Sequence, residues 1–394
     1  VTDCPRYSPP AREDPEIAAL RAVDVDAIVE RPEERDPAWT LLQLLGSPSI
    51  ASKAWAYRQY DSTVRTNTVI GPGGDAAVIR VRGTRKGLAL KTDGNGRYVY
   101  LDPRMGGRIA VAEAARNVAA SGGRPMAITN CLNFGNPRRP EVYYQLSEAI
   151  AGIGEACTAL STPVTGGNVS LYNESPAGAV YPTPVIGMVG LVSDISHATR
   201  ATFRNEGDSV VLFGDNSREL GGSEYLASIH GVVAGPPPTC DLEAERAAIE
   251  ALLECIEGGL VASAHDCSDG GLAVALAECC IANRERHFGI DIALTSMPEV
   301  SSRATFFGEA QARFVLSTNS VEAVLRIAST HGVPALHIGT VTSADAGFRI
   351  KVDDNELRAD VTALSNAYHN AIPNIMARPA LASDAEPELI MAGV

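Results

Sequence analysis

The sequence predicts a mixed α/β protein of the α+β class, organised as two successive domains. At 394 residues, the chain is longer than one ordinary hydrophobic core accommodates. Short β-rich apolar runs alternate with longer stretches whose apolar residues recur at helical spacing. A Pro-rich, charged beginning precedes them. We therefore expect a connecting arm at residues 1–60, domains at 61–197 and 198–375, and a surface tail at 376–394.

The expected elements of the first domain follow from these patterns. Four apolar runs predict strands: residues 76–82, 87–91, 164–165 and 185–192. Two stretches predict helices: residues 105–121 and 141–160. The first helix should end at the glycine pair 122–123, and the second before Pro163, since these residues do not continue a helix.

The second domain and the arm are read in the same way. Strands are expected at residues 209–213, 260–264, 314–317 and 336–341. Helices are expected between Asp241 and Gly258, and at 272–283 and 321–329. The arm holds helical stretches at 16–23 and 39–45. Their pattern is too weak for an independent core, so the arm should pack on the rest.

Charge and composition exclude some classes of function. The net charge is −14, the pI is about 5.0, and no run of Lys and Arg occurs. A nucleic-acid partner is therefore not expected. A small anionic substrate remains compatible, because a few local donors bind one inside an acidic protein.

The cysteines and the ends of the chain indicate a cellular setting. Their spacing matches neither a zinc site nor a disulfide framework, which favours reduced thiols and a cytoplasmic location. The eight cysteines are Cys4, Cys131, Cys157, Cys240, Cys255, Cys267, Cys279 and Cys280. No apolar run suggests a membrane span or a signal peptide. The chain opens at Val1, which we interpret as a start inside a larger protein.

Four polar segments of the first domain are candidates for chemistry, because P-loop, Rossmann, zinc-protease and nucleophile-elbow motifs are all missing. Gly-Pro-Gly-Gly-Asp at 71–75 can cradle phosphate or form a tight turn. In Lys-Thr-Asp-Gly-Asn-Gly at 91–96, Lys and Asp lie on one side of a strand end and can serve phosphate and Mg²⁺; the alternative is a solvated turn. The other two segments occupy 129–137 and 165–174.

The segment at 129–137 contains three asparagines, whose amides can read an adenine edge or complete a metal shell; an Asn-rich structural turn is the alternative. The segment at 165–174 is the most site-like. Its paired glycines permit close backbone approach, and Asn168 and Ser170 should project on one face if it is extended. A β-bulge with incidental polar groups is the competing interpretation.

The second domain adds glycine turns before helices at 220–225 and 265–272, and a polar cluster at 307–313. The turns offer helix N-terminal donors to an anion. His265 can act as an acid or base. We favour the interpretation that it is a hydrogen-bonded structural residue.

Five of these segments in this order resemble the synthetase subunit of phosphoribosylformylglycinamidine synthase. They are Gly-Gly-Asp-Ala-Ala-Val, Cys-Leu-Asn-Phe-Gly-Asn-Pro, Thr-Gly-Gly-Asn-Val-Ser-Leu-Tyr-Asn-Glu, Gly-Gly-Ser-Glu-Tyr and Ser-Asp-Gly-Gly-Leu. The resemblance runs from about residue 60 to about 345. It implies the aminoimidazole ribonucleotide synthetase superfamily, in which the full synthetase contains two copies of a two-domain α/β unit. This chain resembles the second copy, the C-terminal half.

The resemblance also implies a reaction and its participants. Formylglycinamide ribonucleotide, ATP and glutamine-derived ammonia give the amidine, ADP and phosphate, with Mg²⁺ bridging phosphates. ATP and Mg²⁺ are the expected cofactors. The expected partners are the N-terminal half of the same synthetase, a glutaminase subunit and, in some organisms, a small third protein.

Individual positions carry expected roles only through the resemblance. Asn130 matches an ATP contact that is often Asp in the family. Gly167 matches an ATP contact, Asn168 a Mg²⁺ ligand and Ser170 a substrate contact. No catalytic residue is expected in this chain.

Two catalytic features of the family's first copy are missing here. Asn95 stands at the position of the catalytic His, and Asn cannot act as a base near neutral pH. Asn117 stands where the first copy has a metal-binding Asp. We therefore expect this half to be inactive alone and to lend groups to a site completed elsewhere. Its own degenerate site, near Lys91 and Asp93, is a hypothetical place for a structural nucleotide.

Two other functions compete with the ligase. One is a catalytically dead nucleotide-binding scaffold that docks the glutaminase. It would be favoured if no other segment of the mature protein supplies His-Asn-His-Pro. The other is a related kinase or selenophosphate synthetase, against which the segment Cys-Leu-Asn-Phe-Gly-Asn-Pro argues.

Overall fold

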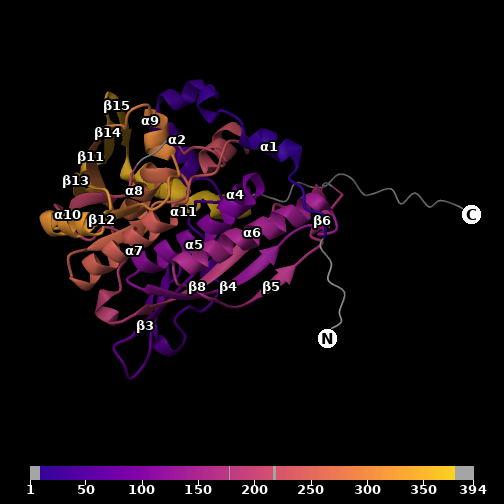
Figure 1. Ribbon diagram of the computed structural model, residues 1–394. Helices are drawn as coiled ribbons and strands as arrows, with labels where there is room; N and C mark the ends of the chain where they lie inside the picture. Colours follow the sequence, from indigo (N-terminus) through magenta and orange to yellow (C-terminus); the bar gives the residue numbers. More distant parts are fainter. Residues whose placement is uncertain (1–8, 177, 216–218, 378–394) are drawn as a thin grey trace, which may run out of the picture.

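The computed structural model describes residues 9–176, 178–215 and 219–377. The start at Val1 and nearly all of the predicted tail lie outside these residues. Two sheets dominate the structure, one from residues 68–192 and one from residues 209–359. Helices lie between and beside them, so that the chain forms a mixed α+β fold, as predicted (Figure 1).

The first sheet has six strands in the order β1-β2-β3-β8-β4-β5. Neighbours are antiparallel except β4 and β5, which are parallel. Its strands are β1 (Thr68–Ile70), β2 (Ala77–Arg80), β3 (Gly87–Asp93), β4 (Arg124–Asn133), β5 (Val164–Ser170) and β8 (Thr183–Val192). A two-stranded ribbon, β6 (Glu174–Ser175) with β7 (Gly178–Ala179), follows β5.

Two long helices cover one face of this sheet: α5 (Pro103–Ala120) and α6 (Pro140–Ala159) (Figure 1). Helix α5 begins where the Asp102 side chain accepts a hydrogen bond from Met105 N, with Pro103 in the first turn. It is alanine-rich and buried on most sides, because the sheet, α6 and the second domain all pack against it. Both helices predicted for this domain are confirmed, and the short α4 (Gly96–Leu101) precedes them.

The second sheet has seven strands in the order β10-β12-β9-β13-β11-β14-β15, all antiparallel except β11 with β14. These strands are β9 (Ser209–Phe213), β10 (Ser263–Asp266), β11 (Phe288–Leu294), β12 (Phe314–Thr318), β13 (Ala335–Ser343), β14 (Phe348–Val352) and β15 (Asn355–Ala359). The accompanying helices are α7 (Leu242–Glu257), α8 (Gly271–Ile281), α9 (Ser302–Phe307), α10 (Val321–Thr330) and α11 (Val361–Met376). Strand β10 begins three residues later than predicted.

Residues 129–133 of the asparagine-rich segment belong to a strand, and not to the structural turn that was the alternative interpretation of this segment. Strand β4 continues to Asn133, and β5 continues through the glycine pair to Ser170. The reason is tertiary. Strand β8 on one side and β5 on the other supply hydrogen-bond partners for β4, so that residues with low strand propensity remain extended.

The arm packs on both domains. It contributes α1 (Pro15–Arg21), α2 (Pro37–Leu45) and α3 (Ala54–Tyr57). Helices α2 and α3 contact the second domain, and α1 contacts α4 of the first. Leu41, Leu44 and Leu45 are fully buried in a core that they share with α8 and the second sheet. Removal of the arm would therefore expose part of that core to water.

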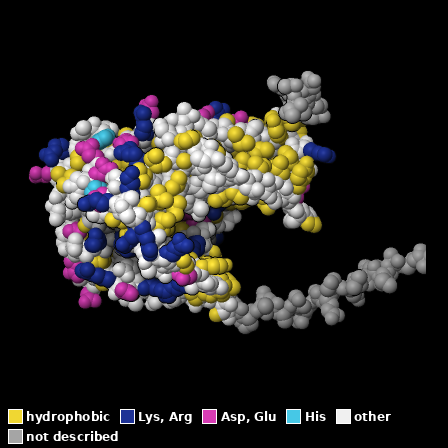
Figure 2. Space-filling view, turned by 90° about the horizontal axis from the view of Figure 1, so that it is seen from below, with side chains coloured by type: hydrophobic (Ala, Val, Ile, Leu, Met, Phe, Trp, Pro, Cys, Tyr) yellow, Lys and Arg dark blue, Asp and Glu magenta, His cyan; other side chains and the backbone are white. Residues whose placement is uncertain are grey.

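The face of the first sheet opposite α5 and α6 is largely uncovered. Along β8, buried residues alternate with half-exposed ones, as expected for a strand that packs on one side. Leu90 and Met126 are 42% and 48% exposed on the sheet. Viewed from below, hydrophobic side chains gather around a deep hollow (Figure 2). Among the described residues, no helix is both long and apolar enough to cross a membrane.

A buried ionic cluster joins the two domains. Arg116 of α5 is fully buried and contacts Glu245 of α7 at 2.7 Å and Asp266 at the end of β10 at 2.5 Å. Burying these charges is costly unless they remain paired. The cluster therefore fixes α5 against the second domain in one arrangement.

We expect Arg116→Met to lower the free energy of unfolding by about 3–5 kcal/mol, because it leaves two buried carboxylates without their cation. Urea unfolding followed by circular dichroism measures this. The matched control is Arg326→Met on exposed α10, which should change stability by less than about 0.5 kcal/mol. Equal stability of the two variants would contradict the proposed role of the cluster.

Candidate functional site

A cavity of about 690 Å³ lies between the first sheet, α5 and the second domain. Its lining includes the glycine turn at residues 72–75, which the sequence suggested for phosphate. Four further residues singled out from the sequence also line it: Lys91, Asp93, Asn117 and His265. The structure thus brings together residues that come from four distant parts of the chain.

Lys91 and Asp93 point to the same side of β3, as their spacing predicted. The Lys91 amine lies 3.7 Å from Asp93 Oδ2. Burial opposes the positive charge of Lys91, but Asp93 and other nearby carboxylates raise its pKa above the ordinary value. Lys91 therefore stays charged and can bind an anionic group.

Asn117 uses its amide to join acidic groups. Its Nδ2 donates to Asp93 Oδ2 at 3.0 Å and to Asp266 Oδ2 at 3.4 Å. An Asp at this position would add a further negative charge to the same cluster. The asparagine thus links carboxylates of the two domains by neutral hydrogen bonds.

Asn95 has a structural role at the beginning of α4. Its Oδ1 accepts hydrogen bonds from Arg97 N and Tyr98 N, and its Nδ2 donates to Asp269 Oδ1 at 3.2 Å. This is the geometry of a helix N-cap. Nothing at this position in the chain can take up a proton near neutral pH.

His265 is held by two carboxylates. Its Nδ1 lies 2.8 Å from Asp75 Oδ1 and its Nε2 lies 3.0 Å from Glu278 Oε2. Burial disfavours the imidazolium, but the two carboxylates outweigh it and raise the pKa of His265 well above its ordinary value. This agrees with the interpretation of His265 as a hydrogen-bonded residue.

Several acidic residues of the cavity were not identified from the sequence. Burial raises the pKa of Asp269 to about 6, and burial together with Asp93 raises the pKa of Glu113 well above its usual range. Glu113 precedes Asn117 by one helical turn, so helical spacing could have revealed it. Asp269 lies in the Ser-Asp-Gly-Gly turn, and only the docking of the domains places it beside Asp93.

The charges of the cavity decide what it can bind. Lys91, Lys53 and His265 face a larger number of carboxylates from both domains. In the described part of the chain, no three His, Cys, Asp or Glu side chains converge closely enough to hold a metal ion alone. An anion bound in this cavity would therefore face an excess of negative charge.

The residues expected from the resemblance lie elsewhere, on β4 and the edge strand β5. Asn130 pairs with Gly167 across these strands, and Asn133 pairs with Ser170. A Cβ atom on Gly167 would lie 2.5 Å from the main-chain oxygen of Asn130, which cannot move aside, and 2.2 Å from Asn130 Oδ1, so glycine is required for this close approach. Asn130 and Gly167 therefore form one packed unit.

Asn168 and Ser170 share one face of β5, as the sequence predicted for an extended segment. Asn168 is exposed on this face, and its Nδ2 donates to Cys131 Sγ at 3.8 Å. Ser170 Oγ donates to Asn173 Oδ1 at 3.2 Å. These side chains border the uncovered face of the sheet.

The four residues expected from the resemblance thus form two pairs on opposite faces of the sheet: Asn130 with Gly167, and Asn168 with Ser170. Strand register aligns Asp93, Ile186, Asn130 and Gly167 in one row across β3, β8, β4 and β5. Asn130 therefore lies roughly 10 Å from Asp93, because neighbouring strands are about 4.8 Å apart. Asn130 and Gly167 share the helix-covered side with the cavity residues, whereas Asn168 and Ser170 do not.

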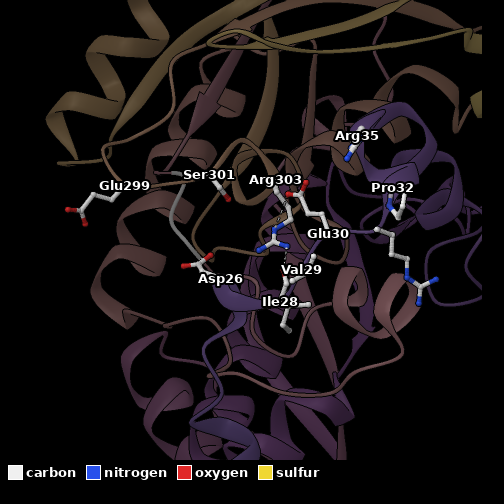
Figure 3. Close-up of a pocket in the computed structure, with 10 residues that line it drawn as sticks. Asp26, Ile28, Val29, Glu30, Pro32, Arg35, Glu299, Ser301 and Arg303 are labelled. Atoms are coloured by element: carbon white, nitrogen blue, oxygen red, sulfur yellow. Dashed lines mark hydrogen bonds and ion pairs between the residues drawn. The ribbon is translucent and has the colours of Figure 1, made fainter.

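Another hollow, of about 720 Å³, lies between the arm and residues 299–303 (Figure 3). Charges of both signs line it, and it contains none of the residues predicted for the site. Arg303 Nη1 donates to the carbonyl oxygen of Ile28 at 3.0 Å and so holds the arm. We assign this hollow a structural role.

Comparison with known proteins agrees with this architecture. Family models of the AIR synthase related protein match twice: the N-terminal domain at residues 73–192 and the C-terminal domain at 205–351. The chain is 48% identical over 381 residues to phosphoribosylformylglycinamidine synthase subunit PurL of Moorella thermoacetica, covering 96% of this chain and 51% of the relative. It is also 48% identical over 348 residues to PurL of Alkaliphilus metalliredigens, covering 88% and 46%.

A solved structure, that of T. maritima PurL complexed with FGAR, has a similar fold. The TM-score is 0.70 at 22% identity, covering 84% of this chain and 53% of that one. The same protein has been solved with AMPPCP, ATP and ADP. The chain spans about half the length of the curated relatives that it matches. The resemblance to the PurL synthetase subunit is confirmed, and the chain belongs to the AIR synthase related protein family, of which it contains both the N-terminal and the C-terminal domain.

Proposed function

We propose that this chain is the C-terminal half of a synthetase that converts formylglycinamide ribonucleotide to formylglycinamidine ribonucleotide in purine biosynthesis. The observation that carries the proposal is the position of Asn168 and Ser170. Both lie on an uncovered sheet face of a chain that spans half of its PurL relatives. In this proposal the sheet face supplies polar contacts, and the N-terminal half of the synthetase lies against it and completes the site.

The reaction proceeds in two displacements. The amide oxygen of the substrate attacks the γ-phosphorus of ATP, the bond to the bridging oxygen breaks, and ADP leaves. Ammonia then attacks the imidate carbon, the C–O bond breaks, and phosphate leaves, with a proton released from nitrogen. Positioning and charge stabilisation are the main tasks of the protein in such phosphoryl transfer.

In this scheme the residues of the chain bind and orient. Asn130 and Gly167 would contact the nucleotide and Ser170 the substrate. Because these pairs lie on opposite faces, one ligand set would have to reach both around the open edge of β5. Asn168 offers an amide oxygen to Mg²⁺, which supplies charge neutralisation on the phosphates when bound. Amide and hydroxyl oxygens are suitable Mg²⁺ ligands but carry no charge, so carboxylates and the catalytic base must come from the other half.

The uncovered sheet face is the surface on which we propose that the N-terminal half docks. Leu90 and Met126 expose apolar area there, at 42% and 48% of their surfaces. A stable monomer rarely leaves a large apolar patch uncovered. The assembly solved as PurLQS of Thermotoga maritima supports further partners, which we propose to be the glutaminase and a small third subunit.

The interdomain cavity is the proposed site of a structural nucleotide. It is separate from the sheet edge, and Lys91 and the glycine turn line it. A nucleotide held there would join the two domains without reacting. If the complete protein lacked a catalytic His, this cavity would make the chain a nucleotide-binding scaffold, which is the alternative function.

We expect Asn168→Ala in the complete synthetase to lower kcat/KM about 10- to 100-fold at limiting Mg²⁺, because a metal ligand is lost. Asn168→Asp should retain more activity, since a carboxylate binds Mg²⁺ more strongly. Steady-state assays over a range of Mg²⁺ concentrations measure this. The control is Asn205→Ala in a turn of the second domain. An unchanged Mg²⁺ dependence in Asn168→Ala would refute the assignment.

The 394-residue chain should bind one ADP in the presence of Mg²⁺ and none in EDTA, because the cavity is acidic and Mg²⁺ would offset the excess of negative charge around the anion. Equilibrium dialysis with labelled ADP measures the stoichiometry. Lys91→Met should weaken binding at least about 10-fold, as expected when a charged hydrogen bond is lost. The exposed Lys86→Met is its matched control. Absence of binding with Mg²⁺ present would eliminate the structural nucleotide.

Binding of Mg²⁺ and ADP should strengthen as the pH rises through about 6. The raised pKa of Asp269 means that this carboxyl holds a proton below about pH 6, and the cation favours the ionised form. Binding at pH 6 should therefore release protons, which calorimetry in two buffers of different ionisation enthalpy detects. Asp269→Asn should flatten the dependence. A flat profile in the unaltered chain would contradict this role of Asp269.

A further inference from the structure

Asn133 lies on the uncovered face beside the residues proposed to contact ligands. It is the last residue of β4, pairs with Ser170 of β5, and shares its face with Cys131. Strand β8 flanks it on the other side, where its register partner is Thr183. Asn133 is thus a central residue of the polar end of this sheet.

Two main-chain carbonyl oxygens fix the orientation of the Asn133 side-chain amide. Its Nδ2 donates to the carbonyl oxygen of Thr183 at 3.0 Å and to that of Cys131 at 3.1 Å. Carbonyl oxygens only accept hydrogen bonds, so the amino group must face them and Oδ1 must face away. A third contact, from Nδ2 to Cys131 Sγ at 3.8 Å, agrees with this orientation. Within the described ranges, the side-chain hydrogen bonds of Asn133 all involve Nδ2, and Oδ1 accepts none.

We propose that Asn133 is a specificity-determining residue whose Oδ1 accepts a hydrogen bond from an N–H group of the substrate. The inference rests on the proposed function. Its register partner is Ser170, the proposed substrate contact, whereas the proposed metal ligand Asn168 pairs with Cys131. Formylglycinamide ribonucleotide carries amide N–H donors, which a fixed, neutral oxygen acceptor recognises.

A preoriented acceptor also discriminates between substrates. An analogue without the N–H would leave Asn133 Oδ1 desolvated and unpaired, which costs more than the loss of a flexible contact. Because the two main-chain carbonyls block rotation of the amide, the side chain cannot turn to present its amino group instead. Asn133 would therefore select for a donor at this point of the substrate.

The test uses the complete synthetase, with saturating ammonium as the nitrogen source so that the glutaminase does not limit the rate. We expect Asn133→Ala to raise KM for formylglycinamide ribonucleotide about 10- to 100-fold while KM for ATP and the Mg²⁺ dependence change less than about twofold. Asn133→Asp should raise KM similarly, because a carboxylate is repelled by both carbonyls and turns away. Asn133→Asp keeps the size of the side chain, so it provides the test if Asn133→Ala fails to fold.

The outcomes separate this inference from the proposed function. Unchanged substrate KM in a folded Asn133 variant, or a shift in Mg²⁺ dependence alone, overturns the assignment of Asn133. If Asn168→Ala is impaired in the same assays, the proposed function survives that result. If neither position affects the reaction, the proposed function fails as well. Asn205→Ala is the control for a remote asparagine.

Discussion

The pairing of Arg116 with Glu245 and Asp266 is the constraint on which the arrangement of the two domains depends. The guanidinium is buried between α5 and the second domain. Any movement of the domains that separated it from either carboxylate would leave a buried charge unpaired. Around it, one continuous apolar core includes residues of α5 and α7 and of both sheets. The domains are therefore fused along this boundary, and the interdomain cavity has fixed walls.

The first sheet separates two kinds of polar site, one on each of its faces. On the helix-covered side, charges of both domains face one another, and Asn95 and Asn117 link them by neutral hydrogen bonds. On the uncovered side, amides and hydroxyls at the ends of β4 and β5 carry no charge and face outward. The first arrangement suits retention of a ligand, and the second suits a site that another protein surface completes.

Much of the fold could be predicted from the sequence because the signals are local. Helices α5 and α6 follow from their apolar spacing and end signals, and β8 follows from its apolar run. Strand β4 was not predicted, because its partners on β8 and β5 are distant in sequence. Asp269 was missed for the same reason, because only the docking of the domains places it beside Asp93, whereas helical spacing from Asn117 could have revealed Glu113.

By itself, the sequence determined which residue types stand at each turn: paired glycines where backbones approach closely, and asparagines where a base or a carboxylate is missing. Local spacing suffices for the glycine turns, whereas the missing base and carboxylate are what the family resemblance implies for Asn95 and Asn117. Only the tertiary structure decided which of these residues meet. Strand register assigned Asn130 and Gly167 to one face of the sheet and Asn168 and Ser170 to the other, since a strand alternates its side chains and its pairing depends on distant partners.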